Sequence, residues 1–299
     1  PLAGIAPATR RLAAPPPRPT TVGIFAADWD SEATNALLSQ FAAACRKNDL
    51  QANLHWLHQN EAVETILAQC HERPEEAAFV LNLGSEINGR LYQRLSERGY
   101  RTVSTDLMPE GYGGDVVATD SRAAVRLGLD HLFSLGHQRI VLLVNEPIRD
   151  KSVVDKIDEF LLRMSEQGLS LVGRIVICGT QSWQNSYDSA YHHMVEVWDS
   201  WSGQRPTAIF TVSDPGAWAV LRWFRERGVE VPGEVSVMGF EDAASSAHVV
   251  PSLTTLAHPS GEAVARCLEV LTAPIPAPHR TQLIPPRLIV RDSTGAAEE

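Results

Sequence analysis

The apolar residues of this chain recur in two patterns that alternate along it. Short continuous apolar runs are typical of strands buried on both faces, and apolar residues three and four positions apart mark one face of a helix. The stretch Asp115–Val144 contains both: a run at Val116–Ala118, a polar corner at Thr119–Ser121, a helical face that stops before Gly136, and a second run at Ile140–Val144. It predicts a strand–helix–strand unit, in which one corner residue caps the helix and Gly136 ends it.

The same alternation extends in both directions from this unit. Further strands are predicted at Thr21–Ala26, Leu50–Leu57, Ala77–Leu83, Arg101–Ser104, Ile175–Cys178, Thr207–Val212 and Ser236–Gly239. Further helices are predicted at Ser31–Asn48, Asn60–His71, Asn88–Arg98, Val153–Gln167, Tyr187–Trp201, Ala217–Arg227 and Gly261–Leu271. Extended pieces are expected at Val249–Leu256, Thr281–Pro285 and Leu288–Arg291. Repeated strand–helix alternation predicts an α/β fold, with parallel sheets covered by helices on both faces.

Length, charge and cysteine usage narrow the class of protein. A chain of 299 residues with 44% hydrophobic content suits two lobes with a sizeable core. Its net charge of −10 repels phosphate backbones, so these residues alone are not expected to bind DNA. The four cysteines are spread out, which favours reduced thiols in a cytoplasmic protein (Cys45, Cys70, Cys178 and Cys267). The sequence contains no run of apolar residues long enough to span a membrane.

Three segments of the chain resemble the effector-binding region of LacI/GalR-type (lactose and galactose repressor) transcription regulators. They are DVVATDSRAAVRLGLDHLFSLGHQRIVLLV at Asp115–Val144, VPGEVSVMGFEDAASSAHVVPSLTTL at Val231–Leu256, and PPRLIVRDST at Pro285–Thr294. With TVGIF near the start, the resemblance covers nearly the whole chain. It implies a type I periplasmic-binding-protein-like fold: two Rossmann-like lobes, each a parallel sheet flanked by helices, joined by three crossovers.

The resemblance also implies how the chain divides between the two lobes. The first crossover is expected near Thr119, where the chain leaves the N-terminal lobe. The expected segments are a Pro/Arg-rich linker over 1–19, an N-terminal lobe over 20–118 and 257–276, a C-terminal lobe over 119–256 and 277–294, and a tail over 295–299.

Ligands of open α/β sheets bind beyond the carboxyl ends of the strands, so the loops after the strands supply the candidate site residues. Asp28 and Trp29 follow the first strand. A carboxylate beside an indole suits a sugar, whose hydroxyls donate to the acid while its C–H face stacks on the ring. A helix-capping Asp with a packed Trp is the alternative. Ser85 is the equivalent candidate after the third strand.

Further ligand-binding candidates are carried over from the resembling family. Lys156, in SVVDKIDEF, stands where the family has an Arg that forks onto the ligand, and a lysine cannot make that bidentate contact. Trp183 stands where an aromatic often stacks on the ligand, and Ser213-Asp214 replaces the usual Asn-Asp. Glu241 replaces an Asp. These changes predict that the chain keeps the fold of the resembling family but binds a ligand through different chemical groups. The alternatives are a solvated surface position for Lys156 and helix-start packing for Trp183.

Neither an enzyme nor a cofactor or metal site is predicted. His55, His58 and the pair His192-His193 have no acidic or cysteine partner at ligand spacing. The glycines at 111–114 do not precede a helix with Lys-Ser or Lys-Thr, which excludes a phosphate loop.

The predicted function is the effector-sensing and dimerisation region of a transcription regulator. A small metabolite, expected to be a sugar or sugar derivative, would bind between the lobes of a homodimer. Operator DNA would be bound only through an N-terminal domain that is not in this chain. Helices Ala33–Cys45 and Asn88–Arg98 are the candidate dimer interface. An extracytoplasmic sugar-binding protein of a transporter is the alternative, and a degenerate cleft that regulates without an effector is a third possibility.

Overall fold

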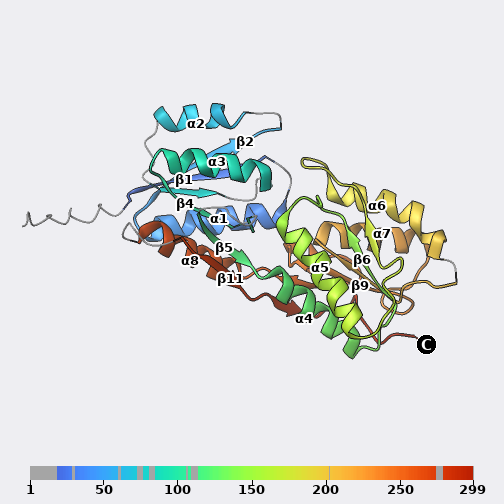
Figure 1. Cartoon of the computed structure of the whole chain (residues 1–299). Coiled ribbons are helices and arrows are strands. Elements are labelled where there is room, and N and C mark those ends of the chain that lie inside the picture. The colour runs from blue at the N-terminus through green and yellow to red at the C-terminus, as the bar shows by residue number, and fades with distance from the viewer. Residues whose placement is uncertain are drawn as a thin grey trace, which may run out of the picture.

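Two lobes, each built on its own sheet, follow one another along the length of the molecule (Figure 1). The computed structural model describes residues 19–28, 31–59, 62–72, 77–80, 85–105, 107–108, 114–201, 203–273 and 279–298. Within these residues the strands form two six-stranded sheets. The predicted α/β fold with two lobes is therefore confirmed.

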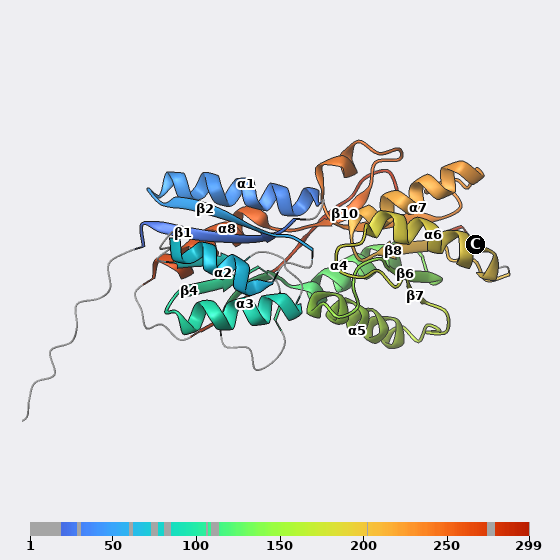
Figure 2. The ribbon, with the colours of Figure 1, turned by 90° about the horizontal axis from the view of Figure 1, so that it is seen from above.

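The N-terminal lobe has an all-parallel sheet in the order β11-β5-β4-β3-β1-β2. Its strands are β1 (Thr21–Ala27), β2 (Gln51–Leu57), β3 (Ala77–Val80), β4 (Arg101–Ser104), β5 (Asp115–Thr119) and β11 (Thr281–Ile284). Helices α1 (Glu32–Lys47) and α8 (Ser260–Thr272) cover one face, and α2 (Val63–Glu72) and α3 (Ser85–Glu97) cover the other (Figure 2). This two-sided cover explains why the strands are continuous apolar runs.

The C-terminal lobe has the sheet order β12-β10-β9-β8-β6-β7, in which the β10–β12 pair is antiparallel. Its strands are β6 (Ile140–Val144), β7 (Ile175–Ile177), β8 (Ala208–Thr211), β9 (Ser236–Glu241), β10 (Thr254–Ala257) and β12 (Arg287–Ile289). One face packs on α4 (Ser121–Ser134) and α5 (Lys151–Glu166), and the other on α6 (Ser186–Val197) and α7 (Asp214–Arg227). Two 3-10 turns complete the lobe, η1 (Trp198–Trp201) and η2 (Ala244–Ala247).

The strand–helix–strand unit at Asp115–Val144 forms as predicted. The side chain of Asp120 caps α4 by accepting a hydrogen bond from the backbone N–H of Ala123 at 2.8 Å. Gly136 follows the helix with φ of 87°, a conformation that residues with a Cβ rarely adopt. Gly128 lets α4 approach the sheet, since a Cβ there would lie 2.9 Å from the ring of Phe210.

The chain passes between the lobes at three points: after β5, after β10 and after β11. The first follows Thr119, the last residue of β5. The hydroxyl of Thr119 lies 2.7 Å from Nδ1 of His258, which lies in the second crossover, so a hydrogen bond joins the two crossovers. The pKa of His258 is lowered to about 3, mainly by burial and to a smaller extent by the positive charge of Lys156. The ring is therefore neutral at physiological pH.

The expected division of the C-terminal segment is wrong in one respect. Residues 277–294 were expected in the C-terminal lobe, but β11 pairs in parallel with β5, with Thr281 opposite Val116 and Ile284 opposite Thr119. The pairing covers a strand that would otherwise form the sheet edge. The third crossover therefore lies at Pro285-Pro286, and Ala257 still belongs to β10.

None of the helices in the described part of the chain combines the length and apolarity that crossing a bilayer requires.

A buried histidine makes the stability of the C-terminal lobe depend on pH. His137 is 2% exposed, and its ring nitrogens lie 3.0 Å from the hydroxyls of Thr207 and Ser236 and from the carbonyl of Gly295. Burial lowers its pKa, so the folded chain resists a proton that the unfolded chain accepts below about pH 6.5. The contribution of His137 to stability is thus complete above that pH and is lost as the pH falls.

We expect His137→Asn to destabilise the chain less at pH 5 than at pH 7.5, by up to about 2 kcal/mol. Urea unfolding at the two pH values measures this difference. The same substitution at the exposed His248 is the control and should show equal effects at both pH values. A penalty for His137→Asn that does not change with pH would contradict the assignment.

Candidate functional site

A cavity of about 1500 Å³ lies between the two lobes. It is lined by the loop after β1 and the start of α1 in the N-terminal lobe, by all three crossovers, and by the loops after β6, β7 and β9 in the C-terminal lobe. These loops follow the carboxyl ends of parallel strands, where ligands of open α/β sheets bind.

Lys156 on α5 is a buried cation in the cavity wall. It is 7% exposed, its Nζ donates a hydrogen bond to the carbonyl of Val212 at 2.9 Å, and the same atom lies 3.7 Å from the centre of the Phe240 ring. Burial lowers its pKa to about 8, against the opposing negative charges of Glu241 and Glu146. The alternative of a solvated surface lysine is therefore excluded.

Two glutamates at the carboxyl ends of β9 and β6, the strands on either side of β8, interact electrostatically with this lysine. Glu241 is the last residue of β9 and lines the cavity, with a backbone φ of 129° that non-glycine residues seldom adopt. Burial raises its pKa well above the usual range, Asp214 and Glu146 raise it further, and Lys156 opposes the shift. The positive charge of Lys156 therefore acts on both acidic side chains, and Val212 supplies its hydrogen-bond acceptor.

Glu146 is the site residue that the sequence analysis missed. It lies two residues after the end of β6 and lines the cavity, and its Oε1 accepts a hydrogen bond from the Ser213 hydroxyl at 2.6 Å. Burial raises its pKa. The rule that selected Asp28, a polar side chain just after a buried strand, could also have selected Glu146.

Trp183 lies on the loop between β7 and α6 with a φ of 72°. It lines the cavity and also packs against the apolar cluster of the other lobe that contains Phe25, Leu57 and Val63. A side chain of the C-terminal lobe therefore contacts the core of the N-terminal lobe across the cleft. This placement differs from the alternative of local packing at the start of α6.

Asp28 lines the cavity from the N-terminal lobe. Its Oδ2 lies 2.7 Å from Nδ1 of His58, in a pair with both side chains largely exposed. The candidate Trp29 lies outside the described residues, as does the side chain of Ser85, which begins α3.

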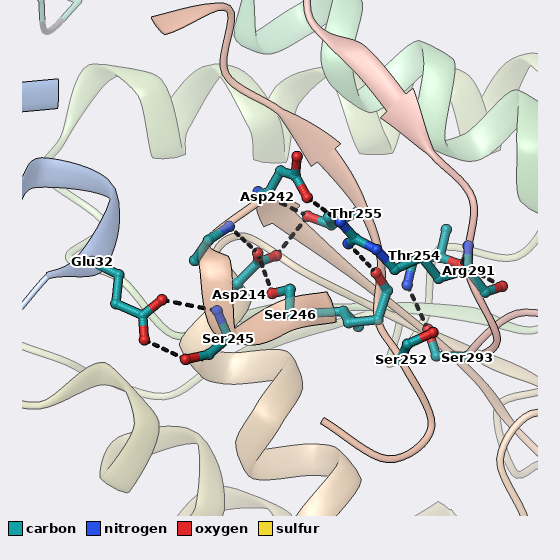
Figure 3. A network of polar contacts seen from close by, with 12 residues as sticks. Glu32, Asp214, Asp242, Ser245, Ser246, Ser252, Thr254, Thr255, Arg291 and Ser293 are labelled. Carbon is teal, nitrogen blue, oxygen red and sulfur yellow. Dashed lines mark hydrogen bonds and ion pairs between the residues drawn. The ribbon is translucent and has the colours of Figure 1, made fainter. Parts of the chain in front are cut away.

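Asp214 supports the loop after β9, and its expected role as a ligand contact must be corrected. The side chain is fully buried, and it accepts hydrogen bonds from the Ala243 N–H at 2.9 Å and from the hydroxyls of Ser246 and Thr255 at 2.6 Å each (Figure 3). Gly239 makes room for it, since a Cβ there would lie 2.2 Å from Oδ1 of Asp214. Its acceptors are therefore used within the lobe.

Ser213 likewise has a supporting role, because it is buried and makes hydrogen bonds to residues next to the cavity. It is 1% exposed, accepts a hydrogen bond from Nδ2 of Asn145 at 2.5 Å and donates to Glu146. Asp242, after Glu241, accepts from Nη2 of Arg291 at 2.5 Å, which ties the loop to the end of the chain (Figure 3).

The charged side chains that line the cavity give it a negative field. Lys156 and Arg287 face seven carboxylates: Asp28, Glu32, Glu146, Asp150, Glu241, Asp242 and Glu262. In a partly closed cleft such charges attract cations and hydrogen-bond donors and repel anions. No group of three or more His, Cys, Asp or Glu side chains that could hold a metal ion occurs among the residues that the structure describes.

Comparisons with known proteins agree with this geometry. The family model of the periplasmic binding protein-like domain matches residues 129–294. The chain is similar to the transcriptional regulator MalR of Streptomyces coelicolor, with 33% identity over 212 residues that make up 69% of this chain and 59% of that protein. The chain thus spans about three fifths of the length of this curated relative.

Solved structures show the same fold. A LacI family transcriptional regulator from Enterococcus faecium with bound ribose superposes with a TM-score of 0.77 at 21% identity, covering 93% of this chain and 100% of that one. The complex of the transcriptional regulator CelR with cellobiose gives a TM-score of 0.79 at 20% identity, covering 94% and 86% of the two chains.

The role of Asp214 can be tested by removing its charge. Asp214→Asn turns one acceptor into a donor that faces a hydroxyl or an N–H, so we expect the free energy of unfolding to fall by about 2–4 kcal/mol. The matched control is Asp242→Asn, since that residue is partly exposed and keeps an acceptor for Arg291, and we expect a loss of about 1 kcal/mol or less. Urea unfolding compares the two variants, and equal losses would contradict a supporting role for Asp214.

Proposed function

Because this chain belongs to the family of periplasmic-binding-protein-like domains found in LacI/GalR-type regulators, we propose that it is the effector-sensing region of a transcription regulator. The observation that carries the proposal is the cavity between the lobes, whose wall combines Lys156 of α5, Glu241 of β9, and Glu146 and Trp183 of two loops. The transporter-linked alternative has less support, because the similar proteins are named as transcription regulators. They are not named as enzymes, and we propose no catalytic role.

The proposed effector is a neutral carbohydrate. Its hydroxyls would donate to Glu146 and Glu241, its oxygens would accept from Lys156, and its C–H face would stack on Trp183. The carboxylates lining the cavity disfavour phosphorylated or acidic sugars. Ligand pockets commonly measure about 300–1,000 Å³, so a cavity of about 1500 Å³ has room for a disaccharide or a longer sugar. The cellobiose bound to CelR on the same fold supports this size class.

The proposed mechanism is closure of the lobes about the three crossovers. A ligand that contacts both lobes favours the closed arrangement by its differential affinity for the two states. Closure would change the spacing between DNA-binding domains attached to a homodimer, and a coupling of about 1–3 kcal/mol gives a 5- to 150-fold effect on operator affinity. With a net charge of −10, this part of the protein would leave DNA contacts to the attached domain.

The location and assembly that go with this function are proposals as well. Cys45, Cys178 and Cys267 are free thiols, and Cys45 and Cys267 are buried, which supports a reducing cytoplasm. The dimer would form through the outer faces of the lobes. On α1, the side opposite the buried Leu38, Phe41 and Cys45 is open to such a contact.

The function can be tested by calorimetric titration with cellobiose, maltose, glucuronate and glucose 6-phosphate. We expect a neutral sugar to bind and both anions to fail. Lys156→Met should weaken binding of that sugar by about 10- to 100-fold, because a charged hydrogen bond is lost while an unbranched side chain of similar length is kept.

The control for this test is Lys151→Met, on the same helix, which removes the more exposed partner of an ion pair with Asp155. It should leave sugar affinity unchanged, and the melting temperatures of both variants should stay close to that of the unmodified chain. Failure of every neutral sugar to bind would favour a degenerate cleft, and unchanged affinity of Lys156→Met would remove Lys156 from the site.

A further inference from the structure

At the edge of the cavity, a carboxylate of one lobe accepts two hydrogen bonds from a serine of the other lobe. Glu32 is the first residue of α1 in the N-terminal lobe, and Ser245 lies in η2 of the C-terminal lobe. The backbone N–H of Ser245 donates to Oε2 of Glu32 at 3.0 Å, and its hydroxyl donates to Oε1 (Figure 3). Both carboxylate oxygens are thus engaged by one residue of the opposite lobe.

The Glu32 side of this contact is held by the start of α1. Ser31 caps the helix, with its hydroxyl accepting from the backbone N–H of Thr34 at 3.2 Å. A negative charge in the first turn is also stabilised by the helix dipole. The carboxylate therefore projects from a fixed helix end.

The Ser245 side is held by the buried Asp214. Asp214 binds the N–H of Ala243 and the hydroxyl of Ser246, the residues two before and one after Ser245. The indole N–H of Trp218 on α7 donates to the same Ser246 hydroxyl at 3.0 Å. These hydrogen bonds fix η2 to the sheet and to α7. Ser245 therefore moves together with the rest of the C-terminal lobe.

We infer that Glu32 and Ser245 form a latch that stabilises the closed arrangement of the lobes independently of any effector. The crossovers are covalent and persist when the lobes separate, whereas this contact must break for the lobes to open. A two-state opening is biased by any interaction that is present in only one state. The latch therefore raises the fraction of closed molecules, and a ligand specific for the closed form binds in proportion to that fraction.

The latch can be separated from a direct ligand contact because only one partner faces the cavity. Glu32 is among the residues that line it, and Ser245 is not among the lining residues of the described chain. Loss of the Ser245 hydroxyl should therefore open the lobes without removing a cavity wall. A role confined to ligand contact would leave Ser245 without effect.

The experiment uses the ligand-free chain and the variants Ser245→Ala, Glu32→Ala and the double substitution. Small-angle X-ray scattering reports the radius of gyration, and amide hydrogen exchange reports the peptide that contains Ser245. We expect both single variants to be more extended than the unmodified chain, with exchange at Ser245 about five- to tenfold faster in Glu32→Ala. The double variant should match Glu32→Ala, because both changes break one contact.

The matched control is Ser252→Ala, which removes a serine–carboxylate hydrogen bond, to Asp292, that lies within the C-terminal lobe. It should leave the radius of gyration unchanged. Circular dichroism of each variant checks that it is folded, and Glu32→Gln, which keeps an acceptor for the Ser245 N–H, provides a milder second variant. The latch is overturned if Glu32→Ala and Ser245→Ala have the radius of gyration of the unmodified chain, or if their effects add in full. Because no effector is used, the outcome is independent of whether the cavity binds a sugar.

Discussion

The buried carboxylate of Asp214 is the interaction on which the cleft side of the C-terminal lobe depends. It joins the start of α7, the loop after β9 and strand β10 through three hydrogen bonds. A buried charge is tolerated only where such donors replace water, so the surrounding backbone must keep its path. That path carries Glu241 to the cavity wall and brings Ser245 to Glu32 of the other lobe. One buried acid thus positions both a proposed ligand contact and the proposed latch.

The cavity wall combines one buried cation with an excess of acid. Lys156 is stabilised by the Val212 carbonyl, the Phe240 ring and the carboxylates of Glu241 and Glu146. Carboxyl oxygens of Glu241 and Glu146 can accept hydrogen bonds from hydroxyl donors, and a polyol supplies such donors. The same field works against anions. The scaffold and the ligand chemistry of this chain are therefore separable. The sheets determine where the ligand site lies, and a few side chains in the cavity wall determine which ligand it selects.

The sequence predicted the helices and strands more closely than it predicted which strands pair and which side chains meet in space. The run Ile140–Val144, a helix cap within Thr119–Ser121 and the stop at Gly136 could be predicted because periodicity, capping and left-handed glycine are local properties. The sheet to which Thr281–Ile284 belongs could not, because strand pairing is a long-range choice. For Asp214, the sequence gives the residue type but not the donors that surround it in space. Glu146 was overlooked although it obeys the strand-end rule.

A crystal structure of the chain with the neutral sugar that it binds most tightly tests the central claim most directly. The account predicts electron density for the sugar between the lobes, with a ring face on Trp183 and polar atoms within hydrogen-bond distance of Lys156 and of Glu146 or Glu241. Density on an outer face of either lobe, or in the cavity but away from Lys156 and both glutamates, would contradict it.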